Sequence, residues 1–128
     1  MTAKQRQEVE RRFDASNRIW NAYDHAREEH PYFCDSLLPD YLLRDNIKER
    51  IARNLAFARR RIKAGVHDHN LMWNEIADCE VWEATEAMFN GDNDAAVEEL
   101  FDVIAVLLRT IDVLEGRQAL GKSKGGEK

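Results

Sequence analysis

The fold is decided by residues 80–102, which read EVWEATEAMFNGDNDAAVEELFD. Two acidic pairs mark the ends of this stretch: Glu80 with Glu83, and Glu99 with Asp102. Side chains three residues apart share one face of a helix, with Cβ atoms roughly 5–6 Å apart, so each pair can direct its carboxylates to one point. The Asn-Gly-Asp-Asn sequence between the pairs is typical of a turn. We therefore predict two antiparallel helices on which four carboxylates converge.

Convergent carboxylates require cations, because several negative charges are not stable together in a partly dry site. Ligands that are all oxygens favour a hard cation, Mg²⁺ or Mn²⁺, over zinc. Asp102 supports this interpretation, since it is the single charge in the apolar run 100–108. An ion pair between Asp102 and a basic residue of a neighbouring helix is the simpler alternative. With three other acids at helical spacing, we favour metal binding.

The quoted stretch resembles the MazG-like all-α nucleoside triphosphate pyrophosphohydrolases, whose pattern is E-x-x-E, a spacer and E-x-x-D. The resemblance covers residues 70–115. It implies Mg²⁺-dependent cleavage of a nucleotide between its α and β phosphates, which gives a monophosphate and pyrophosphate. It also implies four metal ligands: Glu80, Glu83, Glu99 and Asp102. The chain departs from the family at Trp82, where a small residue is common, and at Cys79, where a further glutamate is common.

The composition indicates a single all-α domain. Of the 128 residues, 44% are hydrophobic and 34% are charged, as expected for helices that each bury one apolar stripe. Glycine and proline are scarce and alternating β-branched runs are absent, which disfavours strands. We predict one domain over residues 1–116 and a disordered tail over residues 117–128.

Net charge and cysteine use bear on partners and location. The net charge of −5 disfavours nucleic acid or an anionic membrane as the partner of the whole protein. The two cysteines form no disulfide framework, and the sequence contains neither a signal peptide nor an apolar run of membrane-spanning length. We therefore expect a cytoplasmic protein.

Four helices are expected in an antiparallel bundle, over residues 3–29, 40–64, 70–90 and 93–115. Pro31 would end the first helix, Asp40 would cap the second and Gly65 would end it. The fourth helix is apolar on all sides from residue 103 to 108, which is more than three other helices of one small protomer would cover. We predict that further subunits complete the bundle, in a homodimer or homotetramer.

Basic and aromatic residues near the acidic pairs are candidates for substrate binding. Arg109 lies two helical turns after Asp102 on the same face, so we assign it to the phosphates. The basic residues within 48–63 have three interpretations: a solvated face that complements the helix dipole, a phosphate site that includes Arg60, or a nucleic-acid site, which the net charge disfavours. Trp73 is a candidate for the base pocket, although packing is the simpler role.

Other polar residues lie close to the acidic pairs in sequence. Glu86 and Glu98 adjoin the predicted metal ligands in sequence. Each could hydrogen-bond a metal ligand or orient a water, and the alternative is that each is a solvated surface residue. His67 and His69 lie in a predicted linker without a cysteine partner, so a zinc site is not expected.

The resemblance and the four carboxylates favour a Mg²⁺-dependent pyrophosphohydrolase, with Mn²⁺ as a possible substitute and a deoxynucleoside triphosphate as the favoured substrate. Glu80 or Glu83 is expected to accept the proton of the attacking water. Two alternatives stay open. One is a non-catalytic helical module that dimerises through its fourth helix, and the other is a small regulator that binds nucleic acid through its basic helix.

Overall fold

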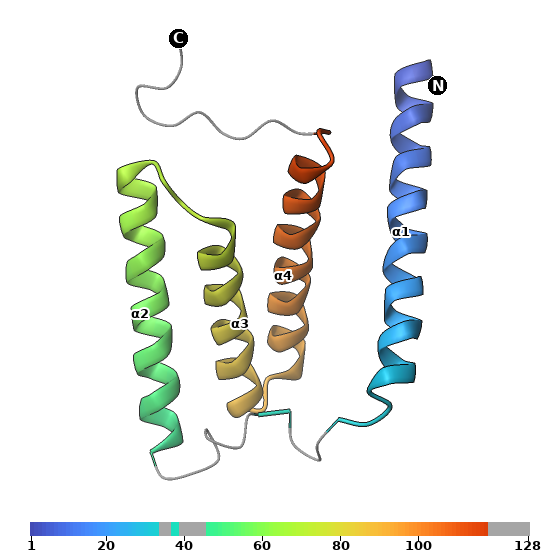
Figure 1. Ribbon diagram of the computed structural model, residues 1–128. Coiled ribbons are helices and arrows are strands. Elements are labelled where there is room, and N and C mark those ends of the chain that lie inside the picture. Colours follow the sequence, from blue (N-terminus) through green and yellow to red (C-terminus); the bar gives the residue numbers. More distant parts are fainter. Residues whose placement is uncertain (34–36, 39–45, 118–128) are drawn as a thin grey trace. The chain divides into compact units, whose positions relative to one another are not determined.

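The computed structural model describes residues 1–33, 37–38 and 46–117 (Figure 1). These residues form four α-helices and no strand: α1 (Ala3–Glu29), α2 (Ile47–Asp68), α3 (Trp73–Phe89) and α4 (Asn93–Leu114). The predicted all-α class and the predicted number of main helices are confirmed. The chain divides into two compact units, Met1–Leu37 and Leu38–Lys128, which are described separately below. The predicted disordered tail lies, apart from its first residue, outside the described residues.

The first unit consists of α1, which begins at a well-formed cap. The Gln5 backbone N–H donates to Thr2 Oγ1 at 3.1 Å, and the Thr2 backbone N–H donates to Gln5 Oε1 at 2.7 Å. This reciprocal pair is a capping box, which satisfies two amide groups that the first helical turn leaves free. The helix ends at Glu29, two residues before Pro31, as the sequence predicts. None of its residues is buried, so its apolar stripe is exposed.

The second helix differs from its prediction at its end. Its predicted start, Asp40, lies outside the described residues. The predicted end at Gly65 is wrong, because α2 continues to Asp68. Gly65 is buried, and a Cβ atom there would lie 3.0 Å from the Leu71 Cα, so the glycine permits a close approach of the following linker. The helix ends instead at His69, which has a left-handed backbone with φ of 58°.

Helices α2, α3 and α4 form the second unit, in which α3 contacts both of its neighbours (Figure 1). In the described parts of α2 and α4, no Cα atom of one helix lies within 8 Å of a Cα atom of the other. The α2–α3 contact buries Leu55 and Ala58 against Cys79, and Trp82 packs at its edge. Small side chains are buried on both helices of the α3–α4 pair, which favours a close approach: Ala84, Ala87 and Ala96. The central helix α3 is therefore held from two sides.

A tight turn joins α3 and α4 and folds them into an antiparallel hairpin (Figure 1). Gly91 has φ of 76°, a conformation that favours glycine. Asp92 caps α4, since its side chain accepts a hydrogen bond from the Ala95 backbone N–H at 3.1 Å. Both features follow the predicted turn chemistry of residues 90–93.

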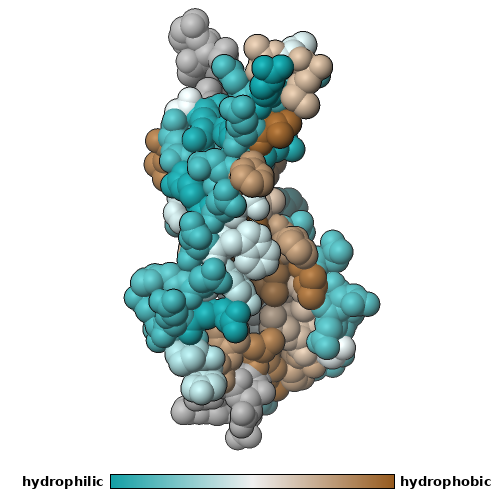
Figure 2. Space-filling model, turned by 90° about the vertical axis from the view of Figure 1, so that its right-hand side faces the viewer, coloured by the Kyte–Doolittle hydropathy of each residue, from teal (hydrophilic) through white to brown (hydrophobic). Residues whose placement is uncertain are grey.

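Hydrophobic side chains remain at the surface (Figure 2). On α4 they occupy one broad face, with exposed fractions between 40% and 61%: Val97, Leu100, Phe101, Ile104, Leu107 and Ile111. We refer to these six residues as the apolar face of α4. Among the described helices, none combines the length and the apolar character needed to cross a membrane.

Candidate metal centre

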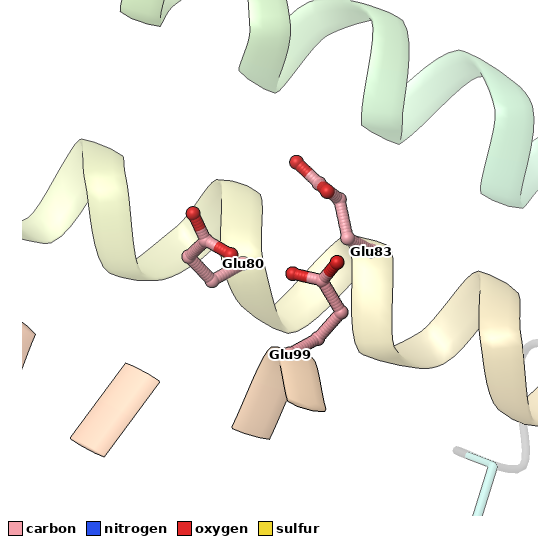
Figure 3. Close-up of side chains that lie close together, drawn as sticks. All are labelled: Glu80, Glu83 and Glu99. Carbon is pink, nitrogen blue, oxygen red and sulfur yellow. The ribbon is translucent and has the colours of Figure 1, made fainter. Parts of the chain in front are cut away.

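Three carboxylates meet at the contact between α3 and α4 (Figure 3). Glu80 and Glu83 lie one turn apart on α3, and Glu99 lies in the second turn of α4. One oxygen of each side chain can be chosen so that all three lie within 4.8 Å of one another. All three side chains are half-buried. We call these three residues the acidic cluster.

The local sequence explains why the acidic cluster forms. The spacing of three residues places Glu80 and Glu83 on one side of α3. The turn at Gly91 returns α4 along α3, and the small side chain of Ala96 at the contact lets the backbone of α4 approach. Glu99, three residues after Ala96, then faces the α3 carboxylates. The predicted convergence of acids from two helices is therefore present in the structure for three of the four residues.

The electrostatic environment favours a proton on the acidic cluster in the absence of a cation. Burial, followed by a side-chain hydrogen bond with Glu99, raises the pKa of Glu80 from 4.5 to about 7. The negative charges of Glu83, Glu99 and Asp102 add to the increase. A divalent cation would replace this proton, because it neutralises the same charges.

Asp102 lies outside the acidic cluster, although its charge acts on Glu80. Asp102 is about 60° of helical rotation from Glu99, and its greater exposure indicates that it lies at the edge of the contact between α4 and α3. Its side chain is exposed, contrary to the burial that its apolar neighbours suggest. Within the described ranges no basic residue forms an ion pair with it, so the simpler alternative gains no support from the structure.

Cys79 supports the acidic cluster from within α3. Its Sγ donates a hydrogen bond to Glu83 Oε1 at 3.4 Å. Burial, together with this hydrogen bond, raises the pKa of the Cys79 thiol to about 11. The thiol therefore stays protonated at neutral pH and acts as a donor, not as a thiolate ligand of a soft metal. The sequence contained a signal for this contact, because Cys79 and Glu83 are four residues apart on one helix.

The donor set fits a hard divalent cation. Magnesium binds oxygens at about 2.1 Å, so two oxygens on opposite sides of one ion lie about 4.2 Å apart. One oxygen of each residue of the acidic cluster lies within 4.8 Å of the others, so small rotations of the glutamate side chains can bring them to the distances that one ion requires. Among the described residues, the site offers carboxylate oxygens and a protonated thiol, which suits Mg²⁺ or Mn²⁺.

The structure does not bring the other predicted site residues into the acidic cluster. The Arg60 guanidinium lies 5.8 Å from the centre of the Phe57 ring, on α2. Trp73 is the first residue of α3 and is half exposed. Glu86 is half-buried on α3, and the remaining two are exposed on α4: Glu98 and Arg109. Their proposed roles toward a substrate stay predictions.

Comparison of the chain with protein-family models, curated proteins and solved structures found no match. The family resemblance therefore rests on the motif residues of the sequence.

Proposed function

We propose that this protein is a Mg²⁺-dependent nucleoside triphosphate pyrophosphohydrolase, which releases pyrophosphate and a nucleoside monophosphate. One observation carries the proposal: Glu80, Glu83 and Glu99 converge from two helices to within 4.8 Å. The resemblance of the E-x-x-E and E-x-x-D motifs to the MazG-like enzymes supports the choice of reaction. The favoured substrate is a deoxynucleoside triphosphate.

In the proposed site the acidic cluster would hold the cation, and Asp102 would contribute from the flank of α4. When bound, Mg²⁺ would polarise the phosphate oxygens and make a bound water easier to deprotonate. Half-burial of the carboxylates strengthens their attraction to the cation, because less water screens the charges. Cys79 positions Glu83 through its thiol hydrogen bond.

A carboxylate of the acidic cluster would accept the proton of the attacking water. The water oxygen forms a bond to the α phosphorus, and the bond from that phosphorus to the bridging oxygen breaks. Both electrons of the broken bond stay with pyrophosphate. Glu80 and Glu83 are the candidates for this role, because both carboxylates belong to the acidic cluster.

The direct test is release of pyrophosphate from a panel of the eight common ribo- and deoxynucleoside triphosphates, with Mg²⁺ and with chelator. We expect metal-dependent formation of pyrophosphate and monophosphate in equal amounts, with deoxynucleotides preferred. Release of single phosphate would retain the metal centre but contradict the reaction. No product with any nucleotide, together with no stabilisation of the fold by Mg²⁺, would contradict the proposal as a whole.

The active form in this proposal is a homodimer or a homotetramer. The apolar face of α4 is exposed in the single chain, and burying it against a second copy would remove apolar side chains from water. The same observation favours a second candidate function, a non-catalytic module that dimerises through α4. The two candidates differ in the metal: only the hydrolase requires the acidic cluster to bind a cation.

A further inference from the structure

Helix α2 packs on α3 along a narrow strip, and the two flanks of that strip carry different arginines. Leu55 and Ala58 form the strip and are buried against Cys79. Arg59 and Arg61 are two residues apart, which corresponds to about 200° of rotation around the helix. The two arginines therefore extend from opposite flanks of α2.

Arg61 occupies the flank that turns away from the acidic cluster. Its Nε donates to Glu75 Oε2 at 2.8 Å, so its charge is already paired. Both residues line a cleft of about 290 Å³ that also includes Asp78. Asp78 and Glu83 are five residues apart on α3, or about 140° of rotation. The cleft and the acidic cluster thus lie on different sides of the α2–α3 contact.

Arg59 occupies the flank beside the acidic cluster. Arg59 directly follows Ala58, which packs against Cys79, and it extends from the flank of α2 opposite the paired Arg61. The Cys79 thiol donates its hydrogen bond to Glu83 of the acidic cluster. Arg59 therefore lies on the side of the α2–α3 contact that carries Glu83.

The surroundings of Arg59 leave room for a ligand. Its side chain is exposed, and in the part of the chain that the structure describes no carboxylate forms an ion pair with it. Two exposed alanines, Ala52 and Ala56, precede Arg59 on the same flank, and their short side chains do not cover it. Lys63, one turn later, adds a second exposed positive charge. Two exposed positive charges thus share the flank of α2 that lies on the Glu83 side of the α2–α3 contact.

We propose that Arg59 is a substrate-binding residue that holds the pyrophosphate end of the nucleoside triphosphate, an inference that rests on the proposed function. This end carries most of the negative charge of the substrate, and a planar guanidinium can bind two of its oxygens at once. Arg59, not its neighbour Arg60, takes this role, because Arg60 lies over the Phe57 ring. The acidic cluster and Arg59 then bind opposite charges of one metal–nucleotide complex.

The test compares Arg59→Ala and Arg59→Lys with Arg53→Ala. Arg53 lies on the same helix and carries the same charge, but it is about 240° of rotation away from Arg59 and exposed on the outer side of α2. Three quantities are measured: kcat/KM for the best nucleotide, inhibition by inorganic pyrophosphate, and binding of Mn²⁺ without nucleotide by electron paramagnetic resonance.

Arg59→Ala should lower kcat/KM and weaken inhibition by pyrophosphate, each on the order of 10- to 100-fold, as expected for a lost charge-assisted hydrogen bond. Arg59→Lys should recover part of both, and Arg53→Ala should match the wild type. Binding of Mn²⁺ should change less than about twofold in every variant, because the carboxylates are intact.

Equal kinetics of Arg59→Ala and Arg53→Ala, with an active wild type, would overturn the role of Arg59 and leave the proposed function standing. Loss of Mn²⁺ binding in Arg59→Ala would also overturn it, since the residue would then act on the structure of the metal centre. A wild type that neither binds Mn²⁺ nor hydrolyses any nucleotide would overturn the proposed function, and the inference with it.

Discussion

Replacing Glu80 by glutamine tests the electrostatics of the acidic cluster directly. In the metal-free protein, burial, a hydrogen bond with Glu99 and neighbouring negative charges raise the pKa of Glu80 from 4.5 to about 7. The folded protein then binds this proton more tightly than the unfolded chain does. Ionisation of Glu80 therefore does not lower the free energy of unfolding below pH 4.5, and it lowers that free energy by its full amount above pH 7. A glutamine cannot ionise and removes that cost.

The size of the effect follows from the same pKa. The difference between 4.5 and about 7 corresponds to about 3 kcal/mol at most. Glu80 is only half-buried, so water screens part of this energy, and we expect Glu80→Gln to raise the free energy of unfolding by about 1–2 kcal/mol at pH 8. In a chain of this length, the melting temperature should rise by roughly 3–10 °C.

The measurement is thermal unfolding by circular dichroism in chelator, from pH 4.5 to pH 8.5. The melting temperatures of Glu80→Gln and the wild type should coincide at pH 4.5 and separate as the pH rises through 7. Excess Mg²⁺ should then stabilise the wild type more than the variant, because the variant lacks one carboxylate. Glu28→Gln, which removes an exposed charge from α1, serves as the control. A Glu80→Gln protein no more stable than the wild type at pH 8 in chelator would refute the convergence of the three carboxylates.

Three further predictions concern catalysis, assembly and packing. Glu83→Gln should lower kcat at least about 100-fold with unchanged helicity, because it removes charge that the proposed cation requires; near-normal turnover would exclude Glu83 from the site. Ile104→Asp adds a charge to the apolar face of α4 and should convert the proposed dimer into a monomer, as measured by light scattering. The control Val66→Asp on α2 should remain a dimer. A dimer that persists in Ile104→Asp would place the interface elsewhere. Gly65→Ala should lower the free energy of unfolding by about 1 kcal/mol, since crowding against the Leu71 backbone outweighs the better helix propensity; a more stable variant would contradict that balance.

Local patterns in the sequence predicted the hairpin, because its determinants are close in the chain. The turn at Gly91 and the cap at Asp92 act within a few residues, and the spacing of Glu80 and Glu83 fixes their shared face. The end of α2 was predicted wrongly for the opposite reason. Whether a glycine ends a helix or permits close packing depends on what lies against it, and Leu71 reaches Gly65 only after the chain has turned.

The remaining details of the site depended on the rotation of each helix about its axis. Asp102 has the same spacing from Glu99 as Glu83 has from Glu80, yet it lies beside the acidic cluster. Consecutive arginines in α2 extend in different directions, and packing against α3 places Arg59 and Arg61 on opposite flanks of the α2–α3 contact. Periodicity gives the spacing of side chains, whereas tertiary contacts decide which way each flank faces.

Helix α2 is held to the α3–α4 hairpin by its packing on α3, so the two parts can separate by local unfolding. Because the described backbone of α2 approaches α3 and not α4, α2 can separate from α3 while the hairpin keeps its own contacts. The hairpin is also the part with the shortest loop to close, so it can form early in folding and carry the acidic cluster with it. Backbone amides of α2 should then exchange with deuterium sooner than those of α3, and the flank with Arg59 belongs to the part that opens more readily.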